Sequence, residues 1–362
     1  MNTGMASPDQ PLQTSPDSDG AAAMIRPSYD HDVSIIIISF NTRDLLRECL
    51  QSALAESARL PPNASAEIIV VDNASRDGSA DMVEREFAAS PTPVRLLRSE
   101  LNLGFGVANN LAIEAACGRY PVLLNSDAFF HPGALARAIA YIDADPSAGI
   151  GGARLISRDG EWQPSARTFH SVCRDALVLT SLSSRFPRSR IFGAPDRTWA
   201  NPDEPAEVDW VTGAFMILRR EALLKTGIFD PAFFLYCEEV DLCRRVKAAG
   251  FRVLYWPGVV VTHLGGESSR QLSEHAFSES EAQVVLWRMR STLLYYRKHH
   301  GAQARWARWL EDGFFTLRRL RNLLSRSPRR LQRAQEASLM LRLMRQAWQE
   351  TNGGRISPPR PW

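Results

Sequence analysis

The sequence predicts an α/β protein: a mostly parallel sheet flanked by helices, followed by a separate helical extension. Three observations lead to this class. Apolar runs rich in β-branched residues, such as 33–38 and 68–71, are typical of strands buried on both faces. Such runs alternate four times with segments of helical apolar spacing, joined by short connections. From about residue 281 onward the pattern is helical and rich in arginine.

The elements follow in order along the chain. Strands are expected at 33–38, 68–71, 94–97 and 120–124, and helices at 44–55, 81–87, 107–116 and 132–142. Gly118 is expected to end the third helix as its C-cap. The second half is less regular, with a hairpin at 158–161, a variable loop at 170–205, strands at 215–218, 253–255 and 259–261, and a helix at 238–249.

Composition divides the chain into four parts. Residues 1–32 are rich in Ser, Pro, Asp and Gly and are expected to form a disordered tail. The α/β domain spans 33–280, a basic helical extension spans 281–350, and 351–362 form a C-terminal tail. The net charge of the whole chain is only +3, yet residues 288–345 hold 15 arginines and lysines with three acids. The positive charge is therefore concentrated in the extension.

Several classes of protein are disfavoured by the composition. The five cysteines are scattered and odd in number, which fits neither a zinc site nor a secreted disulfide framework, so we expect a cytoplasmic protein. No apolar run approaches the roughly 18 residues of a membrane span, and the N-terminus does not read as a signal peptide. Because no nucleic-acid motif accompanies the basic helices, we expect no nucleic-acid partner.

Polar residues follow three of the expected strands, where ligands of parallel sheets usually bind. They are Ser39, Phe40 and Asn41 after the first strand, Asp72 and Asn73 after the second, and Asn125, Ser126 and Asp127 after the fourth. Asp and Asn also start turns, which is the simpler explanation for any one of them. Together they predict a polar crevice at one edge of the sheet.

A glycine-containing loop at 102–110 follows the third strand. Gly104 and Gly106 would let a ligand approach the backbone before a helix N-terminus, with Asn102 beside them. A dinucleotide fingerprint would need a third glycine where Asn109 stands, which disfavours a nicotinamide cofactor.

Carboxylates and one histidine supply the candidate chemistry. Asp127 suits Mg²⁺ or Mn²⁺ beside an anionic ligand, and His263 after the last strand is a candidate second ligand. Glu238, Glu239 and Asp241 open the expected helix at 238–249 as candidate catalytic carboxylates, although acids there also complement the helix dipole. The spacing of Asp241 and Arg245 predicts an ion pair.

These motifs, in this order, resemble the family 2 glycosyltransferases with a GT-A fold, a Rossmann-like nucleotide-diphospho-sugar transferase architecture. The likeness covers about residues 33–300 and points to the bacterial rhamnosyltransferase-like branch. Its markers are 34–41 (SIIIISFN), 69–75 (IVVDNAS), 77–79 (DGS), 102–105 (NLGF), 124–127 (LNSD), 210–214 (WVTGA), 233–236 (FFLY), 238–243 (EEVDLC), and His263 with Gly265 and Ser268.

The resemblance implies roles for individual residues. Residues 33–130 would form the nucleotide-binding half and 131–280 the acceptor and metal half. Asp72 would bind the nucleotide base, while 39–41 and the 102–110 loop would line the nucleoside. Asp127 matches the last acid of the Asp-x-Asp metal motif, with Asn125 in place of the first acid, and His263 matches the metal-binding histidine. Trp210 and Gly213 would flank the sugar or acceptor, and Glu239 matches the catalytic base, which is usually Asp.

The resemblance also implies a function. It is the inverting, metal-dependent transfer of a sugar to a glycan or lipid-linked acceptor in bacterial surface polysaccharide synthesis. The expected donor is dTDP-rhamnose, and UDP-linked donors are left open. The basic extension would then either cap the domain or contact an anionic membrane at its inner face.

Two alternative functions stay open. A sugar nucleotidyltransferase would usually have a basic, Gly-rich loop near strand one, and a catalytically inactive GT-A binding module would explain Asn125 and Glu239.

Overall fold

The core of the protein is a mixed sheet of ten strands in which the longest strand pairs are parallel. The computed structural model describes residues 29–265, 279–323, 325 and 327–358. The strands are β1 (His31–Ser39), β2 (Ala66–Asn73), β3 (Val94–Ser99), β4 (Gly118–Asn125), β5 (Ala128–Phe130), β6 (Ala148–Ile156), β7 (Trp162–Gln163), β9 (Ala206–Glu207), β11 (Phe215–Leu218) and β12 (Arg252–His263). Their main order is β3-β2-β1-β4-β11-β6-β12-β5, with β7 beside β6 and β9 beside β12. A separate two-stranded sheet pairs β8 (Ala166–Arg167) with β10 (Trp210–Val211).

Helices cover both faces of the large sheet, which explains why its inner strands β1, β2 and β4 are mostly apolar. Along β1, Ile35 and Ile37 point into one core and Ile36 into the other. The first core is covered by α1 (Arg43–Ser57), α2 (Ser79–Phe87) and α4 (Ala134–Ala144). The second is covered by α3 (Gly104–Ala115), α7 (Arg220–Thr226) and α8 (Glu238–Ala248).

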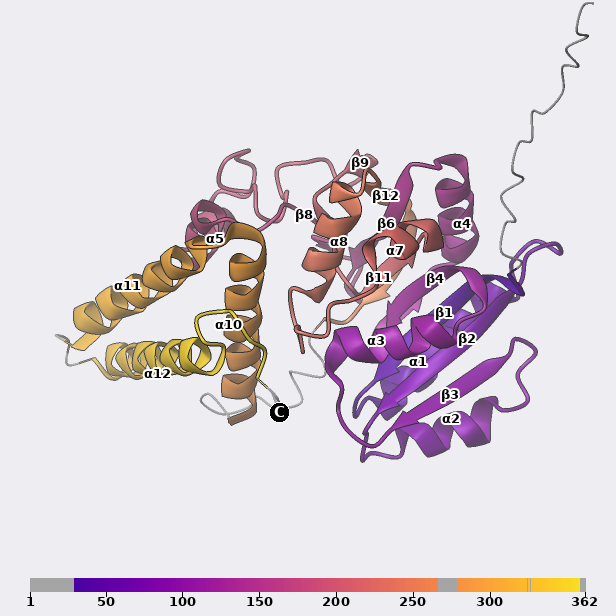
Figure 1. Cartoon of the computed structure of the whole chain (residues 1–362), viewed down its shortest axis with the longest axis horizontal. Coiled ribbons are helices and arrows are strands. Elements are labelled where there is room, and N and C mark those ends of the chain that lie inside the picture. Colours follow the sequence, from indigo (N-terminus) through magenta and orange to yellow (C-terminus); the bar gives the residue numbers. More distant parts are fainter. Residues whose placement is uncertain (1–28, 266–278, 324, 326, 359–362) are drawn as a thin grey trace, which may run out of the picture.

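Three long helices form the C-terminal part of the protein, on one side of the sheet (Figure 1). They are α10 (Glu279–His300), α11 (Gln303–Leu323) and α12 (Pro328–Glu350), and they share a core that includes Leu293, Phe315 and Met344. Helix α10 also belongs to the α/β part, because Leu294 and Tyr295 pack into the second core of the sheet. The extension is thus anchored through α10.

The alternation of strands and helices predicted for the first half is confirmed, and the GT-A-like α/β architecture with a helical C-terminal region is found. Gly118 is not a C-cap, since α3 ends at Ala115 and Gly118 begins β4. A side chain at Gly118 would collide with the backbone of β1, so close strand pairing explains this glycine.

Several other expectations need correction. The supposed loop at 170–205 contains α5 (Val172–Leu179) and α6 (Leu182–Arg185), and the two last strands are one bulged strand, β12. Strands β5 and β6 and helix α7 were not anticipated.

The two ends of the chain also differ from expectation. Of the expected N-terminal tail, residues 1–28 lie outside the described residues, and β1 already begins at His31. Residues 351–358 turn back onto α10, where Thr351 is fully buried.

Candidate active site

The polar residues after β1, β2 and β4 meet at one edge of the sheet, as their positions predict. Strand register places Ser39 beside Asp72 and Ile38 beside Asn125. The Ser39 hydroxyl lies 3.1 Å from that of Thr42, which donates a hydrogen bond of 2.9 Å to Ser126 Oγ. This chain of hydroxyls ties the first strand end to the loop that carries Asp127.

Asp72 presents an unsatisfied carboxylate oxygen in this crevice. Its Oδ2 accepts a hydrogen bond from the Ser75 amide at 3.2 Å, whereas the buried Oδ1 has no hydrogen-bond partner within the described part of the chain. Asn41, at a left-handed φ of 55°, accepts a hydrogen bond from the Arg76 amide, and Phe40 is 41% exposed. A free acceptor on a buried carboxylate suits a ligand N–H group.

The 102–110 loop is held by hydrogen bonds to neighbouring parts of the protein, which occupy the amides of Leu103, Gly104 and Phe105. Asn73 Nδ2 donates to Asn102 Oδ1 at 2.9 Å, and Asn73 Oδ1 accepts from the Leu103 amide at 2.8 Å. Asn109 is buried and donates to the Phe105 carbonyl. These three asparagines therefore fix the loop conformation.

Three glycines that are expected to lie beside a ligand are packed closely against other residues of the protein. A Cβ on Gly104, whose φ is +76°, would lie 2.1 Å from the Phe234 carbonyl oxygen. A Cβ on Gly106 would press on Phe229, and one on Gly213 would lie 3.0 Å from the Phe105 ring. Close packing thus accounts for glycine at these positions, and their predicted places beside a ligand stay predictions.

Asp127 and His263 lie side by side because β5 pairs with the end of β12, which aligns Ala128 with His263. His263 Nε2 is 3.5 Å from Asp127 Oδ1, and its Nδ1 is 3.3 Å from Gln163 Oε1. Burial lowers the pKa of His263, which favours the neutral imidazole that binds metals. Within the described ranges no three His, Cys, Asp or Glu side chains gather as a metal site. Gly265 is described, whereas Ser268 lies outside the described residues.

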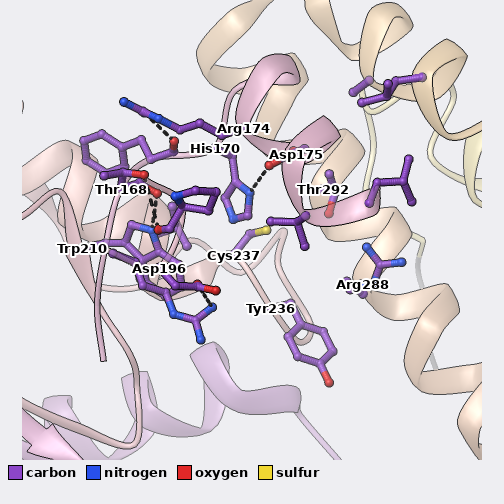
Figure 2. Close-up of a pocket in the computed structure, with 18 of the residues that line it drawn as sticks. Thr168, His170, Arg174, Asp175, Asp196, Trp210, Tyr236, Cys237, Arg288 and Thr292 are labelled. Atoms are coloured by element: carbon purple, nitrogen blue, oxygen red, sulfur yellow. Dashed lines mark hydrogen bonds and ion pairs between the residues drawn. The ribbon is translucent and has the colours of Figure 1, made fainter. Parts of the chain in front are cut away.

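A cavity of about 370 Å³ lies between the second half of the α/β domain and helices α10 and α11. Figure 2 shows its lining: Trp210 and His170 on one side, Arg288 and Thr292 of α10 on the other. Trp210 Nε1 donates to the Thr168 carbonyl, and the ring stacks with His170. Glu239 at the start of α8 also lines this cavity.

The start of α8 places two acids next to each other in a buried setting. Tyr236 and Cys237 precede it with φ of 72° and 67°, a pair of left-handed residues that sets the direction of the helix. Burial raises the pKa of Glu239, partly offset by the positive charges of Arg167 and His170, and one of its oxygens has no partner among the described residues. Burial and Glu239 together raise the pKa of Glu238 well above its usual range.

Glu238 and Asp241 do not line the cavity. Glu238 is 3% exposed and packs on Gly106 of α3. Asp241 is fully buried, and its carboxylate accepts from Arg245 at 2.8 Å, which confirms the predicted ion pair, and contacts Lys298 at 2.7 Å and His299 at 2.6 Å. We therefore assign Asp241 to the docking of α10 on α8, in place of the catalytic role considered for it.

Sequence reasoning missed the cavity residues that come from elsewhere in the chain. His170 and Asp175, linked at 3.0 Å, come from the supposed variable loop, and Arg288 and Glu311 come from the basic helices. The only sequence signal for these four residues was that each is a polar side chain in a segment that also contains aromatic residues. They come together in the fold because α5 packs against α10 and α11.

The two parts of the site are joined by the segment that contains Trp210 and Gly213. Trp210 lines the cavity, and the Ala214 carbonyl four residues later accepts a 3.1 Å hydrogen bond from the Asn125 amide at the sheet edge. A sequence model described as "Glycosyl transferase family 2" matches residues 34–227, which include the strand ends and this segment. The chain belongs to glycosyltransferase family 2.

Two relatives of this glycosyltransferase carry names that specify a sugar. One is the N-acetylglucosaminyl-diphospho-decaprenol L-rhamnosyltransferase of Mycobacterium tuberculosis, 28% identical over 73% of this chain and 86% of that protein. The other is rhamnosyltransferase WbbL of Escherichia coli K12, 24% identical over 73% of this chain and 92% of the relative. These matches confirm the predicted family, enzyme class and likeness to rhamnosyltransferases, so the nucleotidyltransferase and inactive-module alternatives are not retained.

The fold of the transferase is also found in a solved structure. GalNAc-T7 with UDP, GalNAc and Mn²⁺ matches with a TM-score of 0.52 and 17% sequence identity, over 75% of this chain and 52% of that one. This likeness agrees with the predicted GT-A fold.

Proposed function

We propose that the protein is an inverting, divalent-metal-dependent rhamnosyltransferase that uses dTDP-rhamnose and a lipid-linked saccharide acceptor in bacterial surface polysaccharide synthesis. The two rhamnosyltransferase relatives, each matched over most of its length, support rhamnose as the sugar, and the name of the mycobacterial relative supports a lipid-linked acceptor. The observation that carries the proposal is the pairing of the polar sheet edge with a cavity that contains Glu239.

The donor would bind at the sheet edge. Residues 33–130 supply this half, with Asp72 Oδ1 accepting from the nucleotide base and Ser39, Phe40 and Asn41 beside it. Asn73, Asn102, Gly104 and Asn109 would act indirectly, by holding the 102–110 loop in place. We assign residues 131–280 to the acceptor and metal half and 281–350 to the basic extension.

Asp127 and His263 fit a divalent metal. A carboxylate and a neutral imidazole, 3.5 Å apart, are ligands that Mn²⁺ accepts, with Mg²⁺ a second candidate. Asn125 and Ser126 precede Asp127 on the same loop and would line the diphosphate. When bound, the ion would neutralise negative charge on the departing diphosphate.

Glu239 would remove the proton of the acceptor hydroxyl as that oxygen attacks the sugar carbon. Its raised pKa brings the carboxylate nearer to neutral pH, where a general base works best. One displacement of the nucleoside diphosphate by the hydroxyl inverts the anomeric carbon. Trp210 in the cavity wall would position the acceptor.

A thermal-shift series with dTDP, UDP and GDP, each with and without Mn²⁺, tests the donor side. We expect the melting temperature to rise with dTDP and Mn²⁺ together, because a ligand that binds only the native state stabilises it. Asp127→Ala should abolish the effect of the metal. A rise with UDP alone would overturn the choice of donor, and no shift with any nucleotide would contradict the proposed site.

We also propose that the basic extension holds the enzyme peripherally on the inner face of an anionic cytoplasmic membrane. The described helices include none with the length and apolarity to cross a bilayer. On α11, however, Trp306 and Trp309 are each 58% exposed, and Leu317 and Leu320 continue the same stripe. Exposed arginines such as Arg305 and Arg321 flank it. Exposed tryptophans beside cations are typical of membrane interfaces.

Vesicle sedimentation tests this attachment. Vesicles with phosphatidylglycerol should bind the protein, and vesicles of phosphatidylcholine alone should not. Replacing both Trp306 and Trp309 by alanine should weaken binding at least about tenfold, whereas Leu224→Ala, at a 79% exposed position on α7, should not. Equal binding by both variants would contradict the role of α11.

A further inference from the structure

The cavity that contains Glu239 is lined by three further carboxyl groups that the proposed reaction does not use. Asp175 is paired with His170 and Asp196 with Arg167, which leaves Glu311. We propose that Glu311 of α11 is the acceptor-recognition residue, which binds a hydroxyl of the acceptor saccharide on the cavity wall contributed by the C-terminal helices. This inference rests on the proposed function and assigns its acceptor subsite.

The contacts of Glu311 leave it available to a ligand. Its side chain is 14% exposed and lines the cavity, and its buried Oε2 has no hydrogen-bond partner among the described residues. The nearest cation, Arg288 Nη1, lies 3.9 Å from Oε1, which is too long for a hydrogen bond. A carboxyl group that served only to join α11 to α10 would be expected to bond more closely.

A buried carboxyl oxygen that has no hydrogen-bond partner destabilises the ligand-free protein. We therefore expect a functional reason for Glu311 at this position. Burial also raises its pKa, which favours the protonated form. A protonated carboxyl group offers one O–H donor and one carbonyl acceptor. A sugar hydroxyl has the matching donor and acceptor, and would satisfy the orphaned oxygen.

The other walls of the cavity fit a sugar in size and chemistry. A volume of about 370 Å³ lies at the low end of the range for small-molecule sites, which suits a saccharide unit better than a long prenyl chain. Trp210 and Phe169 present aromatic surface, and Thr292 of α10 adds a hydroxyl. Glu239 lies in the same cavity, so a sugar bound by Glu311 is held within reach of the proposed base.

The test measures acceptor and donor separately in Glu311→Leu, Glu311→Gln and the control Asp312→Asn. The probes are dTDP for the donor and N-acetylglucosamine diphosphate with a short prenyl chain for the acceptor. Asp312 is a suitable control because it is adjacent on α11 and pairs with Arg308, outside the cavity.

We expect Glu311→Leu to weaken acceptor binding at least about tenfold, to leave dTDP binding within twofold, and to unfold at the same or a higher temperature. Glu311→Gln, which keeps a donor and an acceptor, should retain most acceptor binding. Unchanged acceptor binding in Glu311→Leu would overturn the assignment, as would failure of the wild type to bind the acceptor probe. A loss of stability in both Glu311 variants with acceptor binding intact would also overturn it. Failure of dTDP to bind would instead contradict the proposed donor.

Discussion

The proposed donor side and the proposed acceptor side of this glycosyltransferase are built in different ways. The donor side consists of loops that directly follow neighbouring strands, so short contiguous motifs such as 69–75 encode it. The acceptor side is assembled from Trp210, Glu239 and Glu311, which come from segments far apart in the chain. The first depends on strand register, and the second on how the C-terminal helices dock. The two sides should therefore respond differently to mutation.

The largest expected effect is on catalysis at the acceptor side. Glu239→Gln removes the proposed base with little change in shape, so kcat should fall by about 10²–10⁴-fold. The affinity for dTDP with Mn²⁺, measured by thermal shift, should stay within twofold of wild type. Full transfer activity in Glu239→Gln would show that another group takes the proton.

A second variant separates docking from chemistry. Asp241→Asn breaks the fully buried contacts with Arg245, Lys298 and His299, and should lower the free energy of unfolding by about 3–5 kcal/mol at pH 7. These partners lower the pKa of Asp241 to about 2, whereas an aspartate in an unfolded chain has a pKa of about 3.9. Its stabilising effect is thus present above pH 4 and is lost as pH falls toward 2.

Chemical denaturation at several pH values measures this difference. The gap between wild type and Asp241→Asn should be widest at neutral pH and narrow below pH 4. Asp312→Asn, which breaks a partly exposed pair, is the control and should change stability by no more than about 1 kcal/mol. A constant gap from pH 7 down to pH 2 would exclude the proposed linkage.

The smallest effect is expected at the donor side. Asp72→Asn replaces a carboxylate oxygen by an amide, so dTDP affinity should fall about tenfold, which corresponds to one charged hydrogen bond. Acceptor affinity should not change, because Asp72 lies at the sheet edge and does not line the cavity. Titration calorimetry with dTDP and with the acceptor probe distinguishes the two. A comparable loss for both ligands would show that the two sides are coupled.

Sequence reasoning succeeded where local pattern decides the structure. The strand–helix alternation, the convergence of Ser39, Asp72 and Asn125, and the Asp241–Arg245 pair all depend on short-range spacing. It failed where tertiary packing decides. The contact of Gly104 with Phe234 and the binding of the 102–110 loop by Asn73 were not predicted, because a sequence does not say which partner lies beside a glycine or an amide. Glu311 was outside any motif, since only the docking of α11 brings it to the cavity.

Helix α11 has a geometric consequence for the length of the acceptor. Its residues Ala307, Leu310 and Glu311 line the cavity, while Trp306 and Trp309 emerge on an adjacent face of the same helix. With that second face on a lipid surface, the wall of the cavity would lie within about one helix diameter, roughly 10–12 Å, of the headgroups. The helix would then act as a molecular ruler. It would favour an acceptor whose reacting sugar lies near the lipid anchor over the far end of a long glycan.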